Sequence, residues 1–169
     1  LLSLWSLSGC AGESNVERAL EDQILHFGLG AEPQSLDPHL ANSVSAHNIL
    51  TALMEGLVSE DPKTSKPTPG VAERWDVSED GTVYVFHFRK NAKWSNGVPV
   101  TAHDFVYSYK RILDPNLGSQ YSSMLHILKN AKIFGEGKKT WEEAEVGVKA
   151  LDDLTLELTL ENPVPYFLE

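Results

Sequence analysis

Residues 94–115 constrain the fold most, because they specify a turn, the start of a helix and its end in one continuous run. Asn96-Gly97 is a strong turn signal, since both residue types tolerate a positive φ at low steric cost. Thr101 is expected to cap a helix, and Asp104 follows three residues later, where it can close a capping box. Asp114-Pro115 then ends the helix. The apolar stripe of this helix comprises Phe105, Val106, Tyr109, Ile112 and Leu113.

Two segments alternate between side-chain types with the period of a β-strand. In residues 82–88, three aromatic side chains share one face, which predicts a strand buried on that side. In residues 154–160, four leucines share one face and the opposite face carries threonine and glutamate. Residues 146–150 are expected to form a third strand. Strands with one apolar and one polar face pack on a core and leave the other side to water, so the sequence predicts mixed α and β structure.

The remaining elements follow from periodicity and from turn-forming residues. Apolar residues recur at three- and four-residue steps between positions 46 and 57, whereas three prolines interrupt the segment that follows. Each of these patterns predicts one element. The expected elements are a strand at 23–29, a helix that starts at Ser43 or Ser45, a connector at 61–70, a helix at 119–128, and a capped helix start at Thr140 with Glu143.

The N-terminal residues 1–9 carry no charge and are mostly apolar, which is typical of the end of a signal peptide. Leu7-Ser8-Gly9-Cys10 is similar to a bacterial lipobox, in which the signal is cleaved before the cysteine and that cysteine is lipidated. Cys10 is the single cysteine, so an intrachain disulfide is excluded. The alternative is an unmodified cysteine. We therefore expect a lipidated Cys10 followed by a flexible tether over residues 10–22.

Charge and motifs exclude several functions. The formal net charge of −10 argues against nucleic acid or an anionic membrane surface as a partner. The six histidines show no spacing typical of metal ligands, and no nucleophile elbow or phosphate loop is present. The lone cysteine belongs to the lipobox. The residues alone therefore predict no metal, no cofactor and no catalytic site, and the chain is not expected to be an enzyme.

Seven sequence blocks occur in order along the chain. They are Ser35-Leu36-Asp37-Pro38-His39, Glu55-Gly56-Leu57-Val58, residues 69–75, residues 86–97, residues 104–108, residues 147–153 and Pro163-Val164-Pro165-Tyr166-Phe167. Together these blocks resemble the bacterial extracellular solute-binding proteins of peptide ABC importers, in particular their oligopeptide-binding subgroup. The resemblance implies an α/β fold of the periplasmic-binding-protein type II kind, in which two lobes close over a ligand.

The resemblance also implies a domain organisation. Residues 23–62 would start lobe I, residues 63–160 would form the extra sub-domain of the peptide-binding branch, and residues 161–169 would return into lobe I. Because the last residues resemble a loop that enters new structure, we expect this chain to be the N-terminal fragment of a longer protein. Such a protein would be an exported, lipid-anchored monomer on the periplasmic side of the envelope, with an inner-membrane permease and ATPase as partners.

Three ligand contacts map onto this sequence by resemblance. They are Asn42, Val44 and Tyr121, which would touch the backbone of an extended peptide held between the lobes. Position 42 carries an amide where the best-known relative has an acidic residue, so a charge-based role is not carried over. Other ligands stay open: a murein peptide, a dipeptide, a nickel complex or haem. A lobe that reports its ligand to a receptor, and an enzyme whose catalytic residues lie elsewhere, are the alternatives from other classes.

Overall fold

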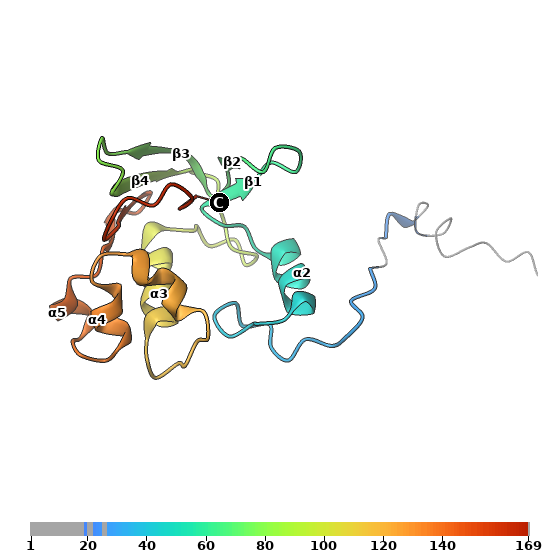
Figure 1. The fold of residues 1–169 in the computed structure, drawn as a ribbon. Coiled ribbons are helices and arrows are strands. Elements are labelled where there is room, and N and C mark those ends of the chain that lie inside the picture. Colours follow the sequence, from blue (N-terminus) through green and yellow to red (C-terminus); the bar gives the residue numbers. More distant parts are fainter. Residues whose placement is uncertain (1–18, 20–21, 25–26, 169) are drawn as a thin grey trace, which may run out of the picture. The chain divides into compact units, whose positions relative to one another are not determined.

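The computed structural model describes residues 19, 22–24 and 27–168 (Figure 1). The chain divides into two compact units, Leu1–Ala31 and Glu32–Glu169. The predicted signal remnant and the lipobox at Cys10 lie outside the described residues. Among the residues that the structure does describe, no helix has the length and apolar character needed to cross a membrane.

The strand predicted at residues 23–29 is wrong for the part that is described. The Ile24 N–H donates to the Ala19 carbonyl at 2.9 Å and Gln23 has a φ of +54°, which is typical of the end of a helix, and residues 27–29 have no regular structure. A strand requires a neighbouring strand for its backbone groups. Among the described residues, none pairs with residues 27–29.

A four-stranded antiparallel sheet is the centre of the second unit. Its strands are β3 (Ala72–Val77), β4 (Val83–Phe88), β5 (Val148–Asp152) and β6 (Thr155–Thr159), in the order β3-β4-β6-β5. The alternation predicted for β4 and β6 is confirmed. The buried side chains of the two central strands are Tyr84, Phe86, Phe88, Leu156 and Leu158.

A group of helices lies beside this sheet; the longest packs on β5 and β6, and the others pack against it and against one another. The helices are α3 (Ala102–Leu113), the 3-10 helix η1 (Ser122–Ile127), α4 (Ala131–Gly135) and α5 (Trp141–Ala144). Figure 1 shows α3, α4 and α5 gathered on one side of the strands. Phe105 of α3 meets Phe88 of β4 edge to face, with ring centroids 5.0 Å apart. The core thus lies between the aromatic face of the sheet and the apolar stripe of α3.

The turn and the cap predicted before α3 are confirmed. Gly97 has a φ of +86°, and its N–H donates to the Trp94 carbonyl at 2.8 Å. One carboxylate oxygen of Asp104 accepts from both the N–H and the hydroxyl of Thr101, at 2.7 and 3.1 Å. These bonds fix the start of α3 and so set the position of every side chain on it.

The segment 61–70, predicted as a connector, contains a strand, which pairs with another strand just before the segment. β1 (Val58–Glu60) pairs with β2 (Pro67–Pro69) antiparallel. The Asp61 N–H donates to the Lys66 carbonyl at 3.0 Å. Hydrogen-bonded pairs alternate in such a ladder, so both prolines fall at positions whose nitrogen points away from β1. Prolines therefore do not prevent a strand here, which the sequence reasoning overlooked.

The helix predicted at residues 119–128 is shorter and tighter than expected. It is the 3-10 helix η1, which ends where Leu128 forms a β-bridge with Leu160. The next residue joins a closed ring of three backbone hydrogen bonds. In this ring Lys129 donates to Thr159 at 2.9 Å, Thr159 donates to Gly147 at 2.8 Å, and Gly147 donates to Lys129 at 2.9 Å. The chain after η1 is thereby tied to the ends of β5 and β6.

The helix predicted from Ser43 or Ser45 is present as α2 (Val44–Leu53), with Ser43 as its cap. The Ser43 hydroxyl accepts from the Ala46 N–H at 3.3 Å. Ala46 is buried, whereas Leu53 and Met54 at the other end are exposed. The helix ends at Leu53, earlier than the apolar repeat suggested.

Candidate functional site

A salt bridge attaches the loop before α2 to helix α3. The Ser35 hydroxyl accepts from the Asp37 N–H, and the Asp37 carboxylate accepts from the His39 N–H, each at 3.0 Å. Arg111, near the end of α3, donates two hydrogen bonds to this carboxylate: Nη1 to Oδ1 at 2.9 Å and Nη2 to Oδ2 at 2.5 Å. Such a two-point bond between planar groups fixes orientation as well as distance.

His39 makes the third contact of this group. Its Nδ1 lies 2.7 Å from Arg111 Nη1, and its Nε2 lies 2.9 Å from the Ser108 hydroxyl. A guanidinium only donates, so Nδ1 must be unprotonated and the ring hydrogen must lie on Nε2, where it donates to Ser108. We call Asp37, His39 and Arg111 the clasp.

The charges of the clasp follow from its contacts. The hydrogen bond from Arg111 lowers the pKa of Asp37 to about 2, against the opposing effect of burial. The same bond raises the pKa of Arg111. Burial, followed by the positive charge of Arg111, lowers the pKa of His39 below its ordinary value of 6.5. The clasp is therefore a neutral imidazole beside an ion pair.

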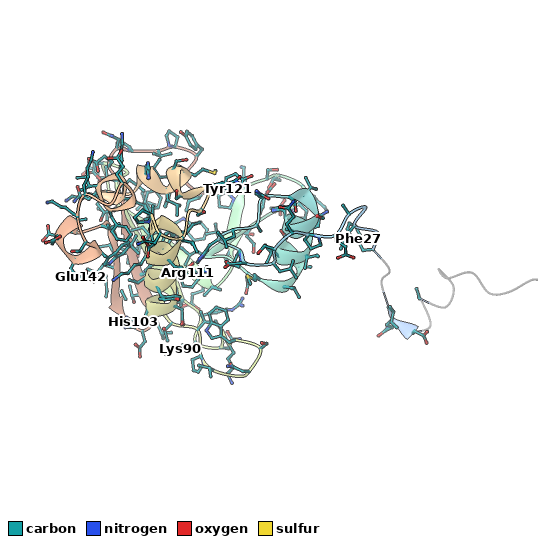
Figure 2. All side chains as sticks on the ribbon, turned by 90° about the horizontal axis from the view of Figure 1, so that it is seen from below. Phe27, Lys90, His103, Arg111, Tyr121 and Glu142 are labelled. Carbon is teal, nitrogen blue, oxygen red and sulfur yellow. The ribbon has the colours of Figure 1, made fainter. Side chains whose placement is uncertain are left out.

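Two of the three predicted ligand contacts are brought together at this edge. Asn42 Nδ2 donates to Gln120 Oε1 at 3.1 Å, although 78 residues separate them, and Tyr121 follows Gln120 in the chain. Val44 is the first residue of α2, two residues after Asn42. Val44 is 78% exposed and Tyr121 is 48% exposed. Figure 2 shows Tyr121 in the region between α3 and α2.

Several residues of this site were not identified from the sequence. Arg111 was not singled out, because its partner lies 74 residues earlier and nothing in the sequence indicates that pairing. Gln120 and Ser119 were also missed. The Ser119 hydroxyl is buried and has no hydrogen-bond partner within the described part of the chain. Two weak signals were available: a basic residue in the last turn of α3 and an aspartate before proline at position 37.

The site is an open surface and not an enclosed pocket. One hollow lies beside β1 and β2, and another lies between α3 and α5. Neither is lined by Asn42, Val44 or Tyr121. Across the residues that are described, no three histidine, cysteine or acidic side chains gather as metal ligands would. The exposed groups can offer hydrogen bonds and apolar contact.

A family model and several known proteins match this chain. The family model "Bacterial extracellular solute-binding proteins, family 5 Middle" matches residues 66–169. The periplasmic oligopeptide-binding protein OppA of Salmonella typhimurium is 52% identical over 150 residues, which are 87% of this chain and 27% of that protein.

Solved structures of peptide-binding proteins are also similar to this chain. The crystal structure of Haemophilus influenzae OppA in complex with the peptide RPPGFSPFR matches with a TM-score of 0.76 and 47% identity, over 82% of this chain and 27% of that one. The Escherichia coli murein tripeptide binding protein MppA matches with a TM-score of 0.75 and 40% identity, over 81% of this chain and 26% of that one. The chain thus spans about a quarter of the relatives that it matches, and it belongs to family 5 of the bacterial extracellular solute-binding proteins.

Proposed function

We propose that this chain is part of the substrate-binding component of an ABC importer that captures oligopeptides. Residues 37–44 and 119–122 would form part of one wall of the ligand cleft, and the remainder of a longer protein would supply the other wall. The observation that carries the proposal is the Asn42–Gln120 hydrogen bond. It supports the proposal because it joins the segment that contains Asn42 to the segment that contains Tyr121, and Asn42, Gln120 and Tyr121 are all exposed.

The chemistry of this edge suits an extended peptide. Asn42 and Tyr121 are uncharged polar residues, and Val44 adds an exposed apolar surface. Uncharged groups that bond to the backbone of a peptide are nearly indifferent to its side chains. Water can fill the space around those side chains at little energetic cost. Many sequences would therefore bind at one site, as an importer of oligopeptides requires.

The remaining parts of the proposal concern the whole protein. The relatives named above are periplasmic binding proteins, and we extend this to an exported monomer held at a membrane by a lipid on Cys10. Residues 63–160 would be the extra sub-domain of the peptide-binding branch, between the two segments of lobe I at 23–62 and 161–169. Closure of the two lobes would present the loaded form to the permease and ATPase.

The test is peptide binding by the full-length gene product. Native mass spectrometry after gentle purification is expected to show peptide adducts, and calorimetry is expected to show binding of synthetic oligopeptides. Tyr121→Ala should weaken that binding, whereas Tyr166→Ala, at another exposed tyrosine, should not. A murein tripeptide, a dipeptide, a nickel complex and haem serve as competing probes. Tight binding of one of these, without binding of oligopeptides, would overturn the oligopeptide assignment.

A further inference from the structure

We propose that Arg111 is a positioning residue for the ligand wall, and that it acts through Asp37 and His39 without touching the ligand. The proposal deepens the function proposed above and rests on it. Asp37 and His39 of the clasp lie in the same loop as Asn42, before α2, and Arg111 lies on α3. The clasp therefore joins that loop to α3, together with the bond between His39 and Ser108.

The backbone between the clasp and the predicted contacts is short and turned. The N–H groups of Leu40 and Ala41 both donate to the Asp37 carbonyl, at 3.0 and 2.8 Å. Asn42 follows at once, and Ser43 then caps α2. A displacement of Asp37 is therefore passed directly to Asn42 and to the first turn of α2. Few residues lie between them to absorb it.

The far side of the wall is fixed independently. Tyr121 precedes η1, whose end is tied to β6 by the Leu128–Leu160 bridge and by the ring at Lys129. The Asn42–Gln120 bond is a single exposed hydrogen bond, which alone contributes little to orientation. The clasp supplies a two-point ionic contact and a histidine contact. We therefore expect the clasp, more than the Asn42–Gln120 bond, to set the distance between Asn42 and Tyr121.

The clasp needs a neutral histidine. The titratable and charged groups that face His39 are Asp37 from its own loop and Arg111 from α3, with Tyr107 next to Arg111. A proton on Nδ1 would remove the acceptor for Arg111 Nη1 and would place two positive charges 2.7 Å apart. Asp37 would offset part of that repulsion. Since the pKa of His39 is lowered from 6.5, the neutral form persists at pH 7 and is lost only as the pH falls through that lowered pKa.

The experiment compares peptide dissociation constants of full-length variants at pH 7.5 and at a series of lower pH values down to pH 4.5. Arg111→Ala is expected to weaken binding roughly tenfold at pH 7.5, the effect of losing a charged hydrogen bond that orients the site. Lys110→Ala is the matched control: it removes the adjacent cation of α3, whose partner at 2.9 Å is Glu142 on α5, and is expected to leave binding unchanged. Wild-type binding should weaken within this series as the pH falls through the lowered pKa of His39.

His39→Asn tests the positioning role through the pH dependence of peptide binding, which a loss of stability alone would not abolish. An asparagine oxygen can take the place of Nδ1 as acceptor but does not titrate. This variant should bind better than Arg111→Ala, and it should not show the loss of affinity that the wild type shows along the pH series. Arg111→Lys, which keeps the charge but not the two-point bond, should lie between wild type and Arg111→Ala. It is read alongside His39→Asn if the alanine variant does not fold.

The outcomes separate the two proposals. If wild-type protein binds no peptide, the proposed function fails and the positioning role fails with it. If wild type binds peptide but Arg111→Ala binds equally well, or if Lys110→Ala weakens binding to the same extent, the positioning role alone is overturned. Retention of the wild-type pH dependence by His39→Asn would also overturn it.

Discussion

Gly147 is the position where a single methyl group should disturb the sheet most. A Cβ built on Gly147 would lie 2.3 Å from the Thr159 carbonyl oxygen and 3.0 Å from the Cβ of Lys129. Real Cβ atoms essentially never come closer than 3.0 Å to such an atom, so in Gly147→Ala the strands must separate by at least about 0.7 Å. The two backbone hydrogen bonds of Gly147, at 2.9 and 2.8 Å, would lengthen by a similar amount.

The cost follows from these contacts. Each backbone hydrogen bond contributes about 1 kcal/mol, and overpacking adds about 1 kcal/mol or more, so the free energy of unfolding should fall by about 3 kcal/mol. The assay is urea unfolding of the whole protein followed by tryptophan fluorescence, which reports on Trp75 and Trp141 beside the core.

A second glycine separates crowding from backbone strain. Gly97 has a φ of +86°, and its added Cβ would meet no described heavy atom within 4 Å. Gly97→Ala should therefore cost only about 1 kcal/mol, the penalty of a left-handed residue. If Gly147→Ala costs no more than Gly97→Ala, the crowding at the ring of three hydrogen bonds is not what requires a glycine there.

Three further predictions concern the cap of α3, the core and the clasp. Asp104→Ala removes both bonds to Thr101 and should lower stability by about 1 kcal/mol in thermal unfolding. Leu156→Ala, at a fully buried side chain, should cost about 2–5 kcal/mol by urea unfolding, whereas Leu151→Ala, at a half-exposed leucine of the same hairpin, should cost under about 1 kcal/mol. Asp37→Asn should lower stability at pH 7 by about 1–2 kcal/mol, an amount reduced from the full pKa shift because the carboxylate is partly exposed. Since the folded pKa of Asp37 is depressed to about 2, that contribution is complete above pH 4 and is lost as the pH falls toward 2, so wild type and variant should converge in acid.

The sequence predicted correctly those features that depend on residues close together in the chain. The cap at Thr101 and Asp104, the turn at Gly97 and the alternation of β4 and β6 each depend on neighbouring residues, and each is confirmed. The hydrophobic pattern also predicted which faces of the sheet are buried. It could do so because burial follows the two-residue period of a strand whatever its partner is.

The features that the sequence did not predict depend on pairing between residues far apart in the chain. The segment at 23–29 has an apolar strand pattern but no described partner strand. Pro67 and Pro69, in contrast, lie in a strand, because β1 bonds to the edge of β2 that faces away from the proline nitrogens. The clasp joins residues 74 positions apart, and the site edge joins residues 78 positions apart. Such contacts depend on how elements pack, so a single sequence indicates the residues of this site by resemblance but not the bonds that hold them.

The prolines of β2 also have a consequence outside the native fold. An edge strand with free N–H groups is a template on which a second chain can add a strand, and repeated addition leads to aggregates. On the outer edge of β2 the nitrogens of Pro67 and Pro69 carry no hydrogen, so an incoming strand finds no donors there. The residues that made this segment look like a connector therefore also protect the hairpin from edge-to-edge association when the protein is concentrated.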